Sequence, residues 1–148
     1  MNDICYNNVE KRRKKDTENV MTACRLTITT SVDGKETDVS YDGQMTLTPL
    51  CATISYKEEN AKVCLKLENG VVFIERKGDY TLSLLLKKGE TCNGNVGIGG
   101  SIGDIQAYTT RLAYSVTDYS FMLSLHYTLF IGGEPQKMKL RLFAKYTN

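Results

Sequence analysis

The residues of this sequence with the clearest chemical potential are one arginine and two tyrosines. Arg76 follows Val72 and Ile74 at every second position, and strand side chains alternate between two faces. Arg76 is therefore expected inside the fold or at its end. A buried guanidinium needs a carboxylate or carbonyl partner, or else a bound anion. In the second case, the hydroxyls of Tyr108 and Tyr127 would complete an anion-binding pocket.

A second candidate site lies on the last predicted strand, where Lys137, Lys139, Arg141 and Lys145 share one face and Phe143 lies among them. Basic side chains beside an aromatic ring are typical of single-strand nucleic-acid surfaces. The same pattern also arises on the solvated face of an amphipathic strand, where lysines discourage edge pairing. The net charge is only +2, from 19 basic and 17 acidic residues. Nucleic acid is therefore the less favoured partner.

The remaining reactive side chains form no catalytic or metal-binding pattern. His126, the single histidine, alternates with Leu125 and Tyr127 and is expected to face outward. Catalysis by histidine needs an orienting partner and a nucleophile, and neither is visible. The five cysteines include no CxxC pair, which argues against a metal site and favours free thiols in a reducing compartment. We expect a non-enzymatic protein without a cofactor.

Residues 1–20 differ from the rest because they lack alternation and contain a basic run at positions 11–15. We expect a flexible or partly helical tail, either solvated or in contact with RNA or an anionic surface. The start of the sequence contains no apolar run of the kind found in a secretion signal. The longest apolar stretch, Leu82–Leu86, is far below the roughly 20 residues of a membrane helix. A cytoplasmic location without membrane contact is expected.

The stretch 93–103 is unusually rich in glycine and contains Gly97-x-Gly99. A phosphate-binding glycine loop would open a helix and carry Gly-Lys-Ser/Thr, and neither feature is present. We expect this stretch to interrupt the strand pattern as a flexible or bulged connection at a barrel rim. A mobile lid over the barrel mouth is the alternative.

The rest of the chain reads as strands. Apolar and polar residues alternate from Thr22 onward, and tight turns are indicated at Asp33-Gly34, Asn69-Gly70 and Gly132-Gly133,. Eight to ten short strands predict an all-β sandwich or barrel. Closure removes the exposed edges of an open meander. We therefore predict a single antiparallel, mostly up-and-down β-barrel over residues 21–148.

Several short motifs carry a family resemblance in their order and spacing. They are Tyr41-Asp42-Gly43, 54–59, 75–78, 86–89, Tyr108-Thr109-Thr110 and 125–132. The region from about Thr22 to Thr147 resembles the YwiB-like family, bacterial proteins of unknown function with a calycin-like (lipocalin-like) β-barrel. The resemblance implies the fold and no established activity. The glycine-rich stretch departs from the family pattern, which has a tyrosine-containing strand there.

Two functions remain open. A barrel of about eight strands can hold one small ligand, apolar or anionic, which favours a non-enzymatic binding protein. Alternatively, a filled barrel would act as a structural or regulatory interaction protein with weak nucleic-acid contact through the basic face. Whether the interior is hollow separates the two, because its expected side chains are bulky. They are Leu82, Leu84, Leu86, Leu123, Leu125, Tyr127, Met138, Leu140 and Leu142.

Overall fold

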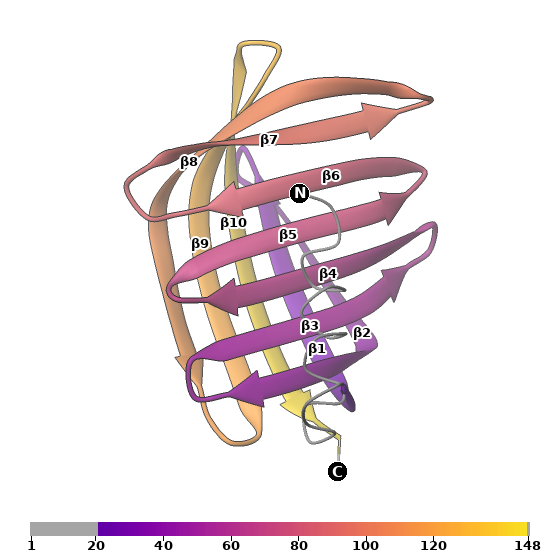
Figure 1. Ribbon diagram of the computed structural model, residues 1–148, viewed down its shortest axis with the longest axis vertical. Helices are drawn as coiled ribbons and strands as arrows, with labels where there is room; N and C mark the ends of the chain where they lie inside the picture. The colour runs from indigo at the N-terminus through magenta and orange to yellow at the C-terminus, as the bar shows by residue number, and fades with distance from the viewer. Residues whose placement is uncertain (1–20, 148) are drawn as a thin grey trace.

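The computed structural model describes residues 21–147, in which ten strands follow one another (Figure 1). The tail predicted at residues 1–20 lies outside the described residues. The strands are β1 (Thr22–Val32), β2 (Lys35–Thr48), β3 (Cys51–Glu58), β4 (Ala61–Glu68), β5 (Val71–Gly78), β6 (Tyr80–Leu86), β7 (Thr91–Ile98), β8 (Ser101–Val116), β9 (Ser120–Ile131) and β10 (Glu134–Tyr146).

Each strand pairs antiparallel with the next, and β1 closes the ring by pairing with β10. The prediction of a single antiparallel up-and-down barrel is confirmed, with ten strands from the expected eight to ten. Figure 1 shows β3 to β6 running across the direction of β8 to β10. The ladder between β1 and β10 joins Cys24–Val32 to Met138–Tyr146. Closure there leaves neither terminal strand as an exposed edge.

The turns follow from residues that tolerate positive φ. Asp33 and Asn69 have φ of 50° and 54°, and each is followed by a glycine with positive φ. This is the pattern of a type I′ hairpin turn, whose twist matches that of the flanking strands. Gly132 and Gly133 turn the chain in the same way between β9 and β10. All three predicted hairpin turns are confirmed.

The glycine-rich stretch corrects the sequence prediction, because it forms a regular hairpin instead of an interruption. β7 and β8 are in register from Thr91–Ile98 to Ser101–Tyr108, and the turn residues Gly99 and Gly100 have positive φ. A Cβ at Gly94 would lie 2.3 Å from the carbonyl oxygen of Ser83 on β6. Glycine therefore permits a close approach of two strands here, and it does not signal irregular structure.

A β-bulge in β8 changes which residues face the core. The register with β9 shifts between Thr109 and Arg111. Thr109 is fully buried before the bulge, and Leu112 packs against the core after it. One extra residue reverses the side-chain alternation, so Arg111 lies on the outer side next to His126,.

The inward side chains fill most of the barrel. The largest fully buried apolar residues include Leu26, Met45, Ile54 and Phe121. Cys24, Cys51 and Cys92 are free and buried, as expected for buried thiols, whereas Cys64 is disulfide-bonded, which corrects the prediction at that position. Within residues 21–147, no helix is long and apolar enough to cross a membrane.

Candidate functional site

The barrel interior is hollow at one end. A cavity of about 380 Å³ lies near the turns that join β1 to β2, β3 to β4 and β5 to β6. Residues on β1 to β6, β9 and β10 form its walls. The lining residues are Ile28, Thr30, Thr37, Val39, Tyr41, Tyr56, Glu58, Val63, Ile74, Arg76, Tyr80, Leu82, Leu84, Tyr127 and Leu140.

The sequence leaves open whether bulky side chains such as Leu82, Leu84 and Tyr127 fill this space. They line the cavity and do not close it. Several of these side chains, such as Leu84 and Tyr127, belong to the buried core and also form the cavity wall, so the core borders the cavity directly.

Tyrosine hydroxyls provide the polar groups on an otherwise apolar wall. Tyr127 is 7% exposed, and burial raises the pKa of its hydroxyl to about 12. Burial also raises the pKa of Tyr56, and the carboxylate of Glu58 adds to this effect. The rings of Tyr41 and Tyr56 pack 4.7 Å apart at a tilt of 32°. Both buried hydroxyls are therefore neutral hydrogen-bonding groups at physiological pH.

Arg76 faces the cavity, as its position in the strand predicts, but its side chain is already paired. Its Nε donates to Glu58 Oε1 at 3.0 Å, and Nη1 donates to the carbonyl oxygen of Tyr80 at 2.8 Å. Its Nη2 lies 2.8 Å from Asp79 Oδ1. The guanidinium carbon also lies 3.7 Å from the centroid of the Tyr80 ring. Two carboxylates therefore balance its charge, as the carboxylate-pairing interpretation predicts.

Tyr108 does not belong to this cavity, which corrects its grouping with Arg76 and Tyr127. Its side chain is 39% exposed, while its neighbours Ala107 and Thr109 are buried. Strand alternation therefore places Tyr108 on the outer face of β8. Of the three ligand-binding residues predicted, only Arg76 and Tyr127 line the cavity.

The predicted basic stripe lies on the outer face of β10 and is wider than the sequence indicates. Lys139 is paired in register with His126 on β9, and His126 is paired with Arg111 on β8. Arg141 is the next residue on the same face of β10 and lies opposite Ser124. The sequence contained no signal for the contribution of Arg111, because simple alternation along β8 ignores the bulge.

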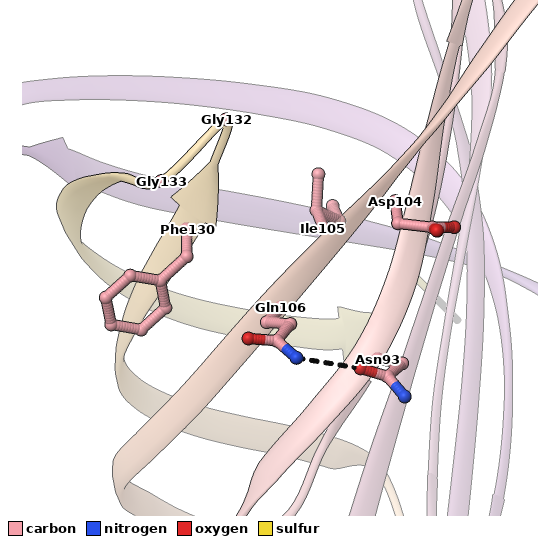
Figure 2. A pocket seen from close by; sticks show the side chains of 7 residues that line it. All are labelled: Asn93, Asp104, Ile105, Gln106, Phe130, Gly132 and Gly133. Carbon is pink, nitrogen blue, oxygen red and sulfur yellow. Dashed lines mark hydrogen bonds between the residues drawn. The ribbon is translucent and has the colours of Figure 1, made fainter.

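A further hollow of about 550 Å³ lies outside the barrel over β7, β8 and the turn between β9 and β10 (Figure 2). Gln106 Nε2 donates to Asn93 Oδ1 at 3.2 Å, and both residues are exposed. Figure 2 shows Phe130 and Asp104 on opposite sides of this amide pair. Because its polar side chains are exposed and already share a hydrogen bond, this hollow offers weaker recognition than the barrel cavity, whose polar groups are buried,.

Comparison with known proteins places this barrel in a family. The model of a domain of unknown function, DUF1934, matches residues 22–142. The chain belongs to the DUF1934 family. No curated protein matches the sequence.

The DUF1934 barrel is also similar to a solved structure, the crystal structure of the ywiB protein from Bacillus subtilis. The two chains share 15% sequence identity with a TM-score of 0.74, over 89% of this chain and 99% of that chain. The expected YwiB-like family and its barrel fold are confirmed. At this level of identity the likeness establishes the fold alone.

The described part of the DUF1934 barrel lacks a cluster of metal-ligating side chains. Among residues 21–147, no three His, Cys, Asp or Glu side chains are grouped so that they could hold a metal ion. Burial raises the pKa of the Cys24 thiol, which disfavours the thiolate form required of a metal ligand or nucleophile. The barrel cavity and the outer basic face are therefore the two sites with a chemical rationale.

Proposed function

We propose that this protein binds one small, mostly apolar and uncharged molecule in the barrel cavity. The observation that carries the proposal is the free hydrogen-bonding capacity of the cavity. Tyr56 and Tyr127 line the cavity and are more than 90% buried, and among the described residues neither hydroxyl has a hydrogen-bond partner that affects its pKa. Buried polar groups are normally hydrogen-bonded. A ligand that donates to or accepts from these hydroxyls would satisfy them.

The walls support an apolar ligand. Ile28, Val63, Ile74 and Leu84 are at least 90% buried and surround the hydroxyls. A volume of about 380 Å³ falls within the range of roughly 300–1,000 Å³ that small-molecule sites occupy. Burial of apolar ligand surface contributes about 25 cal/mol per Å² before the cost of association. Burial of apolar surface therefore provides the affinity for the ligand, and hydrogen bonds to the tyrosine hydroxyls fix its orientation.

The pairing of Arg76 supports an uncharged ligand over an anionic one. Glu58 and Asp79 both contact the guanidinium, so the charges at this end of the cavity sum to one negative charge. An anion would have to displace a carboxylate from a hydrogen bond of 3.0 Å or less. Charge-assisted hydrogen bonds of this kind are among the stronger ones in proteins. A neutral molecule can use the cavity without breaking them.

The first test uses the neutral fluorescent probe N-phenyl-1-naphthylamine, which brightens in apolar surroundings. We expect saturable binding to the wild type and loss of that signal in Val39→Trp. Val39 lines the cavity and is 39% exposed, so a larger ring there fills the space without overpacking the core.

The matched control is Ser40→Trp, because the next residue on β2 is exposed and does not line the cavity. Equal probe binding by both variants would contradict the proposal. Native mass spectrometry of protein purified from cells extends the test. We expect a mass adduct in the wild type and in Ser40→Trp that is absent from Val39→Trp.

A further inference from the structure

The outer face of the barrel carries a row of basic side chains that crosses three strands. Arg111, His126 and Lys139 lie in register on β8, β9 and β10. Cross-strand neighbours have Cβ atoms about 5 Å apart, so Arg111 and Lys139 flank the imidazole of His126 on both sides,. The ion pairs among the described residues include none of these three side chains. No ion pair among the described residues therefore neutralises the positive charges of Arg111 and Lys139.

The pKa of His126 reflects this crowding. Burial lowers the pKa of its imidazole, and the charges of Lys139 and Arg111 lower it further. Ser124 and Arg141 lie beside the row, with Arg111 Nε donating to Ser124 Oγ at 3.0 Å. Across β1, the nearest acidic side chain lining this region is Glu36 on β2.

The row lies in a hollow of about 350 Å³. Beside the cationic groups, the hollow presents the hydroxyl-bearing residues Thr29, Ser31 and Ser124. Positive groups together with hydroxyl donors in a concave surface are the chemistry that recognises phosphate oxygens.

A second hollow, of about 630 Å³, adjoins the first and shares Thr29, Arg111, Ser124 and Arg141 with it. Most of the residues that only this second hollow contains are apolar or aromatic. Phe143 and Met122 are opposite each other on β10 and β9 and are 45% and 53% exposed. An exposed aromatic ring next to a cationic groove can stack a nucleic-acid base.

From these two hollows, we infer that the outer face of β8, β9 and β10 binds single-stranded nucleic acid, with phosphates in the Arg111–His126–Lys139–Arg141 hollow and a base against Phe143. The surface also includes Lys137 and Lys145 at the two ends of the β10 stripe. This inference is independent of the ligand proposed for the barrel cavity, because the two sites lie on opposite sides of the sheet.

Single strands fit this surface better than a duplex or a membrane does. In a duplex the bases are stacked and paired, so Phe143 and Met122 would contact only backbone. An anionic membrane requires a broad basic surface. The hollow here is bordered by Glu36 on β2, and the same strand also carries Asp38 and Asp42. A narrow cationic groove with one aromatic platform matches the single-strand mode.

The test measures fluorescence anisotropy of labelled oligothymidylate of about 15 nucleotides, a length at the upper end of single-strand site sizes. With the full chain, we expect binding that falls steeply with added salt. Lys139→Gln and Arg141→Gln should each weaken binding about fivefold and reduce the salt slope by about one. Phe143→Ala should weaken binding at least about fivefold at every salt concentration, because base stacking does not depend on charge.

The matched control is Lys62→Gln, which removes one charge from an exposed position on β4. An equal loss in Lys62→Gln would show a nonspecific charge effect and overturn the proposal. Unchanged binding in Lys139→Gln, with loss only when Arg12 and Lys14 are neutralised, would overturn it too. Tight binding to phosphatidylserine vesicles without binding to the oligonucleotide would have the same consequence.

His126 gives an independent readout because it is the only histidine in the chain. Its single ring resonance reports the pKa directly by NMR titration. We expect the oligonucleotide to raise the pKa of His126, because phosphate charge offsets Lys139 and Arg111,. Lys139→Gln should raise the same pKa without ligand. A pKa that does not move with saturating oligonucleotide would place the ligand elsewhere and contradict the proposal.

Discussion

At the scale of single residues, Arg76 shows how one side chain organises the cavity end of the barrel. It joins Glu58 on β3 to Asp79 and Tyr80 at the start of β6. Its side chain is only 10% exposed, whereas those of its two carboxylate partners are 32% and 55% exposed. Its hydrogen bond also lowers the pKa of Asp79 below the usual range. The guanidinium therefore holds the end of β3 against the start of β6, which is a structural role.

Replacing Arg76 tests that role. We expect Arg76→Ala to lower the free energy of unfolding by about 1.5–3 kcal/mol, because charge-assisted hydrogen bonds are lost and Glu58 keeps a half-buried charge. Urea unfolding followed by far-UV circular dichroism measures the change.

The exposed pair Arg25–Asp42, with side chains 62% and 80% exposed, provides the comparison. Arg25→Ala should cost less than about 1 kcal/mol, as exposed pairs do. Equal losses in the two variants would mean that burial of Arg76 adds nothing to stability.

At the scale of elements, the hairpin of β7 and β8 shows two different uses of glycine. Gly94 occupies a point where β6 comes too close for a side chain, since an added Cβ would lie 2.3 Å from the Ser83 carbonyl oxygen. Gly103 on β8 has no atom within 4 Å of the same added carbon. Two glycines in one hairpin are therefore expected to respond in opposite ways to the same substitution.

We predict that Gly94→Ala lowers the free energy of unfolding by about 1–3 kcal/mol, because backbone must shift to relieve the overlap. Gly103→Ala should change it by less than about 0.5 kcal/mol or raise it slightly, since alanine restricts the unfolded chain. The same urea titration measures both variants. A Gly103→Ala loss as large as that of Gly94→Ala would show that the close approach to β6 is not the cause.

At the scale of the whole molecule, closure is complete in topology but uneven in hydrogen bonding. β1 and β10 pair over nine residues on each strand. The second half of β8, after the bulge, pairs with β9 only, because the ladder with β7 ends at Tyr108. Just before the bulge, Thr109 forms an isolated parallel bridge with Lys88 in the connection between β6 and β7, and no ladder among the described residues continues along that edge. We therefore expect this edge to open more readily than the ladder between β1 and β10.

Native-state hydrogen exchange should detect the difference. We expect alternate amides of Leu112–Val116, which point away from β9, to exchange much faster than amides of β1 that pair with β10,. Protection spread evenly over both segments would indicate that the second half of β8 has a partner along this edge as well.

The sequence by itself determined the local features of this protein. Alternation fixed which side chains of β9 and β10 face inward, and Asp33-Gly34 and Asn69-Gly70 fixed two turns, because each depends only on neighbouring residues. Tyr127 and Arg76 were correctly placed inside for the same reason.

Only the tertiary structure decided the features that depend on several strands at once. The hollow end of the barrel depends on the combined volumes of fifteen side chains, and the pairing of Arg76 depends on how β3 and β6 meet. The bulge in β8 reversed the alternation and brought Arg111 beside His126. Tyr108 lies outside the barrel. The sequence did not reveal this, because its local pattern did not show which face of β8 shares the interior with Arg76. Contacts between distant strands follow from packing and register, which a single chain's pattern does not encode locally.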